Sequence, residues 1–148
     1  MRQRIFARWH CSTLNQLNMT KAEAQIKQLE KATARLAEVL DMEKNTINRD
    51  ASIQRFEFTF DLAWKTLKEY LMDYLKIRCA SPKKCFREAY RQSVIEYEQD
   101  WNNMADDRNA TAHMYKEELA DAVYVKLPGY LELIQALLKK LQSETKRE

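Results

Sequence analysis

Residues 48–77 read NRDASIQRFEFTFDLAWKTLKEYLMDYLKI, and their apolar pattern is the strongest indication of the fold class. Its centre, residues 56–62, alternates apolar and polar side chains as a β-strand would. A helical spacing of three to four residues nevertheless continues along the whole stretch without a breaker, in Ile53, Phe56, Phe60, Ala63, Leu67, Leu71 and Tyr74. Strands are seldom this long, so the sequence predicts one long helix.

This predicted helix carries apolar side chains on two faces. At about 100° per residue, Phe58 and Leu62 project roughly opposite the stripe that contains Ile53 and Phe60. One face would enter the bundle core and the other would meet a second subunit, so we expect a homodimer through this helix. The alternative is that Phe58 and Leu62 pack against another helix of the same chain. Glu57 lies at the edge of the main apolar face, where a carboxylate must be paired or hydrated, and is a candidate to orient a cation.

Two further helix starts flank the long helix. Thr20 and Glu23 have the spacing of a capping box, and an apolar stripe of helical period follows over residues 20–41. Ser81 and Pro82 form a cap followed by a first-turn proline, which predicts a helix after residue 81.

The remaining expected elements are a shorter segment around Trp101 and a last helix over residues 109–141, kinked or broken at Pro128-Gly129.

Composition excludes most other folds. One glycine and two prolines among 148 residues are too few for β-hairpins, phosphate-binding loops or dinucleotide-binding turns. We therefore expect an all-α, up-and-down bundle of four or five helices, formed by residues 19–148 as one domain.

The net charge of +3 is located at one end of the chain. Residues 1–18 contain Arg2, Arg4 and Arg8 and no acidic residue, so the rest of the chain has 22 basic and 22 acidic residues. The composition therefore shows no strongly basic face of the kind that marks many nucleic-acid-binding proteins. We expect residues 1–18 to be a flexible extension, and no apolar run is long enough to span a membrane.

The three cysteines, Cys11, Cys79 and Cys85, have neither an even count nor a CxxC spacing. They indicate no disulfide framework and no structural zinc site, and we expect free thiols in the reducing cytoplasm. A metal held by Glu57, Asp61 and His113 is a weaker alternative, because Asp61 can pair with Lys65 or Lys68 along the helix.

Candidate chemistry is concentrated in residues 107–115, DRNATAHMY. Arg108 is suited to bidentate recognition of a phosphate, His113 can exchange protons near neutral pH, and Tyr115 adds a hydroxyl. Cleavage of RNA through its 2′-hydroxyl needs a proton shuttle and positive charge at the phosphorus, so no metal cofactor is required. On a continuous helix Arg108 and His113 would point apart. Either Arg108 precedes the helix, with Asn109 or Thr111 as its cap, or the groups converge across a dimer axis.

The chain resembles the HEPN domain proteins, in the branch encoded beside minimal nucleotidyltransferases and often labelled nucleotidyltransferase substrate-binding proteins. Residues 49–68 are similar to the second-helix signature of that family, and residues 108–115 fit its motif of Arg, a polar residue, three spacers, His, any residue and Tyr. The resemblance covers roughly residues 20–141. It implies a dimeric bundle with Arg108 and His113 in a cleft between protomers, and supporting roles for Asn109 and Glu57 follow more weakly.

Two functions are compatible with this resemblance. In toxin members of the family, the Arg and His support metal-independent RNA cleavage, and a partner nucleotidyltransferase silences the toxin by adenylylating the tyrosine that matches Tyr115. AMP on that tyrosine would add bulk and negative charge where an RNA phosphate binds. The alternative is a non-catalytic subunit that presents a substrate to the nucleotidyltransferase, which the neutral body of the chain favours.

Overall fold

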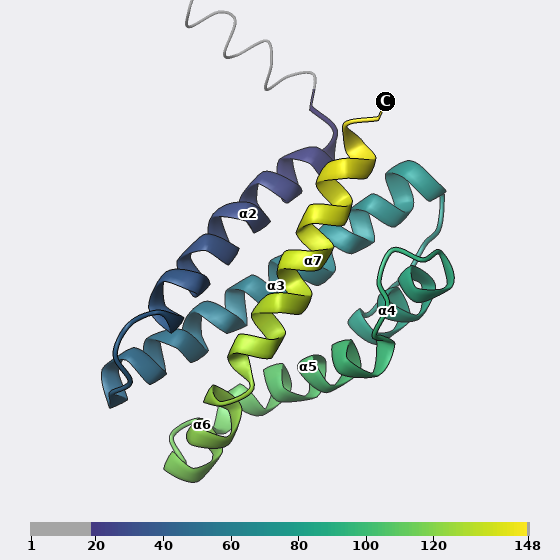
Figure 1. The fold of residues 1–148 in the computed structure, drawn as a ribbon. Coiled ribbons are helices and arrows are strands. Elements are labelled where there is room, and N and C mark those ends of the chain that lie inside the picture. Colours follow the sequence, from purple (N-terminus) through teal and green to yellow (C-terminus); the bar gives the residue numbers. More distant parts are fainter. Residues whose placement is uncertain (1–18, 148) are drawn as a thin grey trace, which may run out of the picture.

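The computed structural model describes residues 19–147 as an all-α bundle (Figure 1). This confirms the fold class expected from the scarcity of glycine and from the helical period of residues 48–77. The predicted N-terminal extension, residues 1–18, lies outside the described residues. None of the helices within residues 19–147 combines the length and the apolar character that a membrane span requires.

Helices α2 (Lys21–Leu40) and α3 (Thr46–Leu75) form a long antiparallel pair (Figure 1). Both lie close to their predicted ranges. Thr20 caps α2 by accepting a hydrogen bond from the Glu23 backbone N–H at 3.1 Å. The second half of the predicted capping box is replaced by a tertiary contact, because the Glu23 carboxylate accepts from the Tyr74 hydroxyl at 3.2 Å.

One face of α3 forms the centre of the core. Phe56 and Phe60 are buried, and Phe56 stacks on the Tyr130 ring of α7 (Leu127–Thr145) at a centroid distance of 5.6 Å. Helix α7 packs against both α2 and α3, and Figure 1 shows it running along this pair. The long apolar stripe of α3 therefore predicted the core-facing side of this helix correctly.

Helices α4 (Pro82–Arg91) and α5 (Glu98–Ala110) follow on the other side of α3. Pro82 stands in the first turn of α4 as predicted, although the Ser81 side chain makes no capping hydrogen bond. Trp101 of α5 is buried against Phe86 of α4 at a centroid distance of 5.1 Å. These contacts hold the N-terminal half of α5 and leave its C-terminal turn to approach α3.

The last helix predicted over residues 109–141 starts too early, and its expected interruption at Pro128-Gly129 lies a few residues too late. The chain forms a 3₁₀ turn (Thr111–His113), then α6 (Glu117–Tyr124), then α7. Pro128 does not kink a continuous helix but stands in the first turn of α7, where its missing N–H costs no intrahelical hydrogen bond. The break precedes the proline, and the candidate motif lies in the turn between α5 and α6.

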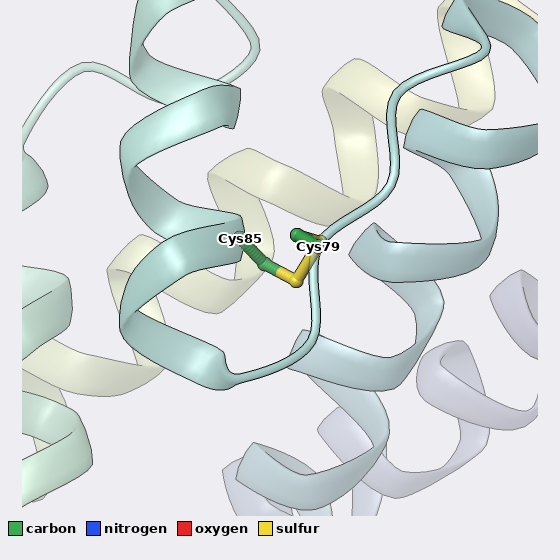
Figure 2. The surroundings of a disulfide bond; sticks show 2 residues. All are labelled: Cys79 and Cys85. Carbon is green, nitrogen blue, oxygen red and sulfur yellow. A yellow bond between two sulfur atoms is a disulfide. The ribbon is translucent and has the colours of Figure 1, made fainter.

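The expectation of free thiols at Cys79 and Cys85 is also wrong. These residues form a disulfide that links the segment after α3 to α4 (Figure 2). The two cysteines lie six residues apart, a spacing that matches neither the CxxC pattern nor a disulfide framework, so the spacing carried no signal for this bond. The cysteines therefore no longer support a reducing compartment.

Candidate functional site

Arg108 lies in the last turn of α5 and is held by α3. Its Nε and Nη2 donate to the two carboxylate oxygens of Asp61 at 3.1 and 3.0 Å, and its Nη1 donates to Thr111 Oγ1 at 3.0 Å. The hydrogen bonds from Arg108 to Asp61 raise the pKa of the guanidinium above its usual value. Arg108 is therefore a permanent cation whose orientation is set by a carboxylate from another helix.

The guanidinium of Arg108 keeps donors for a further acceptor. Three of its five N–H groups are used by Asp61 and Thr111, and the remaining two make no hydrogen bond with the described residues. Glu57, predicted to orient a cation, places Oε2 3.9 Å from Arg108 Nη1, which is an ion pair without a hydrogen bond. Arg108 together with Asp61 and Glu57 has a formal charge of −1, so a phosphate at Arg108 would also meet two carboxylates.

The neighbouring residue Asp107 attaches α5 to the start of α7. Its carboxylate accepts hydrogen bonds from the Tyr130 hydroxyl and, at 3.2 Å, from Lys126 Nζ. Burial, together with the adjacent Asp107 carboxylate, raises the pKa of the Tyr130 hydroxyl well above its usual range, so it remains a hydrogen-bond donor. The last turn of α5 is thus attached to α7 through Asp107 and to α3 through Arg108.

His113 and Tyr115 lie on the exposed connection between α5 and α6. The Tyr115 side chain is among the most exposed large side chains of the described residues, at 76%, and its ring meets the His113 ring edge to face at a centroid distance of 6.3 Å. The suggestion that Arg108 precedes a helix capped by Asn109 or Thr111 is wrong. Arg108 is inside α5, and the helix ends two residues later at Ala110, where the chain tightens into the 3₁₀ turn.

The structure brings the predicted residues together in two pairs. Arg108 forms an ion pair with Glu57, and His113 makes a ring contact with Tyr115. Within residues 19–147 no hydrogen bond, ion pair or ring contact joins the two pairs. Asn109 is exposed, and its side chain makes no hydrogen bond with the described residues. Convergence of Arg108 and His113 across a dimer axis stays a prediction.

The second apolar face of α3 is partly covered by the same chain. The Arg35 guanidinium of α2 lies over the Phe58 ring, 5.2 Å from its centroid, and Leu62 packs on the edge of the core. Both side chains remain half-buried in the single chain. The homodimer through this face is not tested by these contacts and stays a prediction.

The binding of Asp61 to Arg108 was not predicted from the sequence. Asp61 was expected to pair with Lys65 or Lys68, or to join Glu57 and His113 around a metal, and instead it binds Arg108 from α5. Among the described residues, no three His, Cys, Asp or Glu side chains come together in a group that could hold a metal ion. Glu57 and Asp61 are carboxylates four residues apart on one helix face, and this spacing could have indicated the site. Such a pair can bind a cation from another helix as well as a cation nearby in sequence.

We expect Asp61→Asn to lower the free energy of unfolding by about 1 kcal/mol, since it weakens a charge-assisted bidentate pair that is partly exposed to solvent. Urea denaturation followed by circular dichroism measures this change. Glu57→Gln is the matched control on the same helix face, and we expect a smaller effect because Glu57 makes no hydrogen bond to Arg108. Equal losses in the two variants would contradict the assignment of Asp61 as the residue that holds Arg108.

Comparison with known proteins places the chain in a family. Residues 17–143 match the sequence model of the family described as "Nucleotidyltransferase substrate binding protein like". A protein of Haemophilus influenzae named "Probable ribonuclease HepT" is 29% identical over 137 residues, which cover 86% of this chain and 94% of that protein.

Two solved structures are similar to this fold. A protein from Thermus thermophilus is 39% identical, with a TM-score of 0.74 over 76% of this chain and 98% of that chain. A protein from Haemophilus influenzae, described as revealing the fold of a substrate-binding domain of a nucleotidyltransferase, is 28% identical, with a TM-score of 0.58 over 82% of this chain and 96% of that chain. This chain therefore belongs to the nucleotidyltransferase substrate-binding protein family, which has the HEPN-like fold.

Proposed function

We propose that this protein is a metal-independent endoribonuclease of a toxin–antitoxin pair and that a partner minimal nucleotidyltransferase neutralises it by adenylylating Tyr115. The observation that carries the proposal is the geometry of residues 108–115. Arg108 is held by Asp61 with two N–H donors left over, and exposed His113 and Tyr115 side chains follow on the next turn. The relative named a probable ribonuclease supports the same function.

The proposed reaction uses a nucleophile that RNA itself contains. The 2′-hydroxyl oxygen attacks the adjacent phosphorus and loses its proton, the bond from phosphorus to the 5′-oxygen breaks, and that oxygen gains a proton. His113 transfers protons as general acid or base, and Arg108 stabilises the negative charge that grows on the phosphoryl oxygens. The products are a 2′,3′-cyclic phosphate and a 5′-hydroxyl.

The proposed site is completed by a second copy of the chain. The half-buried Phe58 and Leu62 on α3 provide apolar surface for a homodimer, and α3 also carries Asp61, which holds Arg108. A two-fold axis near this helix would place two Arg108 side chains and two His113 side chains around one cleft. We place this activity in the cytoplasm, where RNA and ATP are both available.

The proposed regulation acts on Tyr115. Its hydroxyl oxygen would attack the α-phosphorus of ATP bound to the nucleotidyltransferase, a phosphodiester bond would form, and pyrophosphate and the hydroxyl proton would leave. At 76% exposure the Tyr115 side chain is accessible to a partner enzyme. The added AMP carries a phosphate into the site proposed for the RNA phosphate, so it would exclude the substrate by charge and by volume.

One observation favours the alternative, a non-catalytic subunit that presents a substrate to the nucleotidyltransferase. Glu57 and Asp61 give the surroundings of Arg108 a net negative charge, which disfavours an RNA phosphate there. Under this alternative, expression of the chain alone would not inhibit growth, and His113→Ala would change nothing.

Coexpression of the chain with its partner nucleotidyltransferase tests the regulation. We expect the intact mass to increase by a single AMP group, and we expect Tyr115→Phe to prevent the increase because it removes the acceptor hydroxyl and keeps the ring. Tyr97→Phe is a matched control, since Tyr97 is also exposed but lies at the other end of α5. An AMP increment that persists in Tyr115→Phe would contradict the proposal.

A further inference from the structure

Arg49 on α3 is a buried cation that the proposed chemistry does not use. It is only 5% exposed and is the one charged residue in the buried class within residues 19–147. A buried charge is costly unless it is paired and hydrogen-bonded, so its partners indicate what it holds.

The partners of Arg49 include two residues of α6. Nη1 donates to Glu117 Oε2 at 2.6 Å and to Asp121 Oδ1 at 3.0 Å, and Nε donates to Asp50 Oδ1 at 3.0 Å. Glu117 and Asp121 lie four residues apart and therefore on one face of α6, Glu117 at its first residue and Asp121 one turn later. The hydrogen bonds from Arg49 lower the pKa of the Glu117 carboxyl, so it stays ionised at neutral pH. We name the group of Arg49, Glu117 and Asp121 the α6 clamp.

The α6 clamp and the Arg108–Asp61 pair attach the two ends of one segment to the same helix. Asp61 of α3 binds Arg108 just before residues 109–116, and Arg49 of α3 binds Glu117 just after them. Arg49 and Asp61 are 12 residues apart, which corresponds to about 18 Å along a helix. Residues 109–116, which carry His113 and Tyr115, therefore span two fixed points on one rigid element.

The segment between these points touches the core at Thr111, which is buried, and at Met114, which packs against the core. Beyond the end of α5, its internal backbone hydrogen bonds are those of single turns, such as Met114 N–H to Thr111 O at 3.3 Å and Lys116 N–H to His113 O at 3.1 Å. His113, Tyr115 and Lys116 are exposed. Because these contacts and single turns are the support of the segment, its stability also depends on where its two ends are attached.

We propose that the α6 clamp is a positioning device that fixes the segment carrying His113 and Tyr115, and that Arg49 is a positioning residue for RNA cleavage. The consequence for cleavage rests on the proposed function, whereas the effect on the segment does not. Ala120 and Val123 bury the other face of α6 in the core, so α6 stays folded on the bundle when the clamp is removed.

The test removes the clamp from its exposed side. Glu117 and Asp121 have side-chain exposures of 70% and 55%, so the double variant Glu117→Ala/Asp121→Ala removes no buried atoms. Arg49 keeps its ion pair with Asp50 in this variant, whereas removal of Arg49 would disturb buried atoms. Glu118→Ala is the matched control, because Glu118 is the next residue on α6 and makes no ion pair within the described part of the chain.

Two readouts separate positioning from general stability. Amide hydrogen exchange of the protein alone should become about tenfold or more faster in residues 112–117 of the double variant, with no change in α2 and the core half of α3. The rate of RNA cleavage should fall by about 10–100-fold in kcat with little change in KM, since a displaced His113 is misaligned while Arg108 still meets the phosphate. The control should match the wild type in both.

Each outcome decides the proposal. Unchanged exchange in residues 112–117, or faster exchange spread equally over the whole bundle, would overturn the α6 clamp as a positioning device. Faster local exchange with wild-type cleavage would overturn the role of Arg49 in the reaction. If the wild-type protein cuts no RNA, the proposed function fails, and the exchange measurement still decides whether the clamp places the segment.

Discussion

His113→Ala is expected to lower the rate of RNA cleavage by about 10²–10⁴-fold, which is the usual contribution of a positioned general acid or base. His113 is exposed at the end of the 3₁₀ turn and supports no part of the core, so the thermal midpoint of unfolding should stay at the wild-type value. Initial rates on a labelled RNA at saturating concentration, measured beside a thermal melt of each protein, give both quantities.

The matched control for His113→Ala is Ala112→Ser, a change at the neighbouring exposed position of the same turn. We expect this variant to retain the wild-type rate because it adds one small polar group and removes no reactive one. If His113→Ala cuts RNA as fast as the control, His113 is not the proton shuttle. The non-catalytic alternative would then account better for the protein.

Arg108→Ala is expected to lower kcat by about 10²–10³-fold, the cost of removing one preorganised donor from a developing negative charge. Arg108→Lys should recover only part of the loss. It restores a cation, but an ammonium group cannot make the bidentate bond to Asp61 and still present two donors to a phosphate.

Removal of Arg108 also leaves Asp61 without its partner, so a structural loss must be separated from a catalytic one. Asp61→Asn provides that separation, because it weakens the same pair while the guanidinium remains. We expect Arg108→Ala to lose far more activity than Asp61→Asn at similar stability. Equal losses in the two variants would mean that Arg108 acts only as a structural link between α5 and α3.

The fold could be predicted from the sequence to the extent that it depends on periodicity and local capping. The apolar stripe of residues 48–77 identified α3 and its buried face, and Thr20 and Pro82 marked two helix starts. These features depend on residues that are close together in the chain, so they can be recognised in a single sequence. A break near Pro128-Gly129 was expected, and α7 begins at Leu127. The turn over residues 111–116 was missed because the apolar spacing continues through residues 111–126, whose sequence contains neither glycine nor proline.

The scarcity of glycine predicted the fold class correctly, but the position of the one glycine did not predict where the backbone adopts a left-handed conformation. The two positive-φ residues in the described chain are Lys76 and Ser93, at φ 57° and 58°, and neither is glycine. Lys76 ends α3 in the left-handed conformation, with the Ile77 N–H bonded to Leu71 O at 2.9 Å. Gly129 instead lies in the first turn of α7, where a Cβ would meet no atom within 4 Å. Nothing in the structure explains a glycine there.

The candidate site was predicted only in part because its contacts join distant residues. The motif of residues 108–115 named Arg108, His113 and Tyr115, and the edge position of Glu57 indicated a nearby cation, which the structure shows to be Arg108. The Asp61 partner lies 47 residues from Arg108 in sequence, and the α6 clamp joins residues 68 and 72 apart. Such pairings follow from how α3 packs against α5 and α6, and this packing cannot be inferred from the local patterns of a single sequence.

The chemical nature of the RNA fragment ends shows whether this protein cleaves RNA through the 2′-hydroxyl without a metal. Purified protein, shown to be folded by circular dichroism, is incubated with RNA in excess EDTA, and the ends of the fragments are identified by mass spectrometry. We predict cleavage that leaves a 2′,3′-cyclic phosphate and a 5′-hydroxyl, and we predict its loss in His113→Ala. An intact RNA pool with folded wild-type protein, or fragments with 5′-phosphate ends, would contradict metal-independent cleavage through the 2′-hydroxyl.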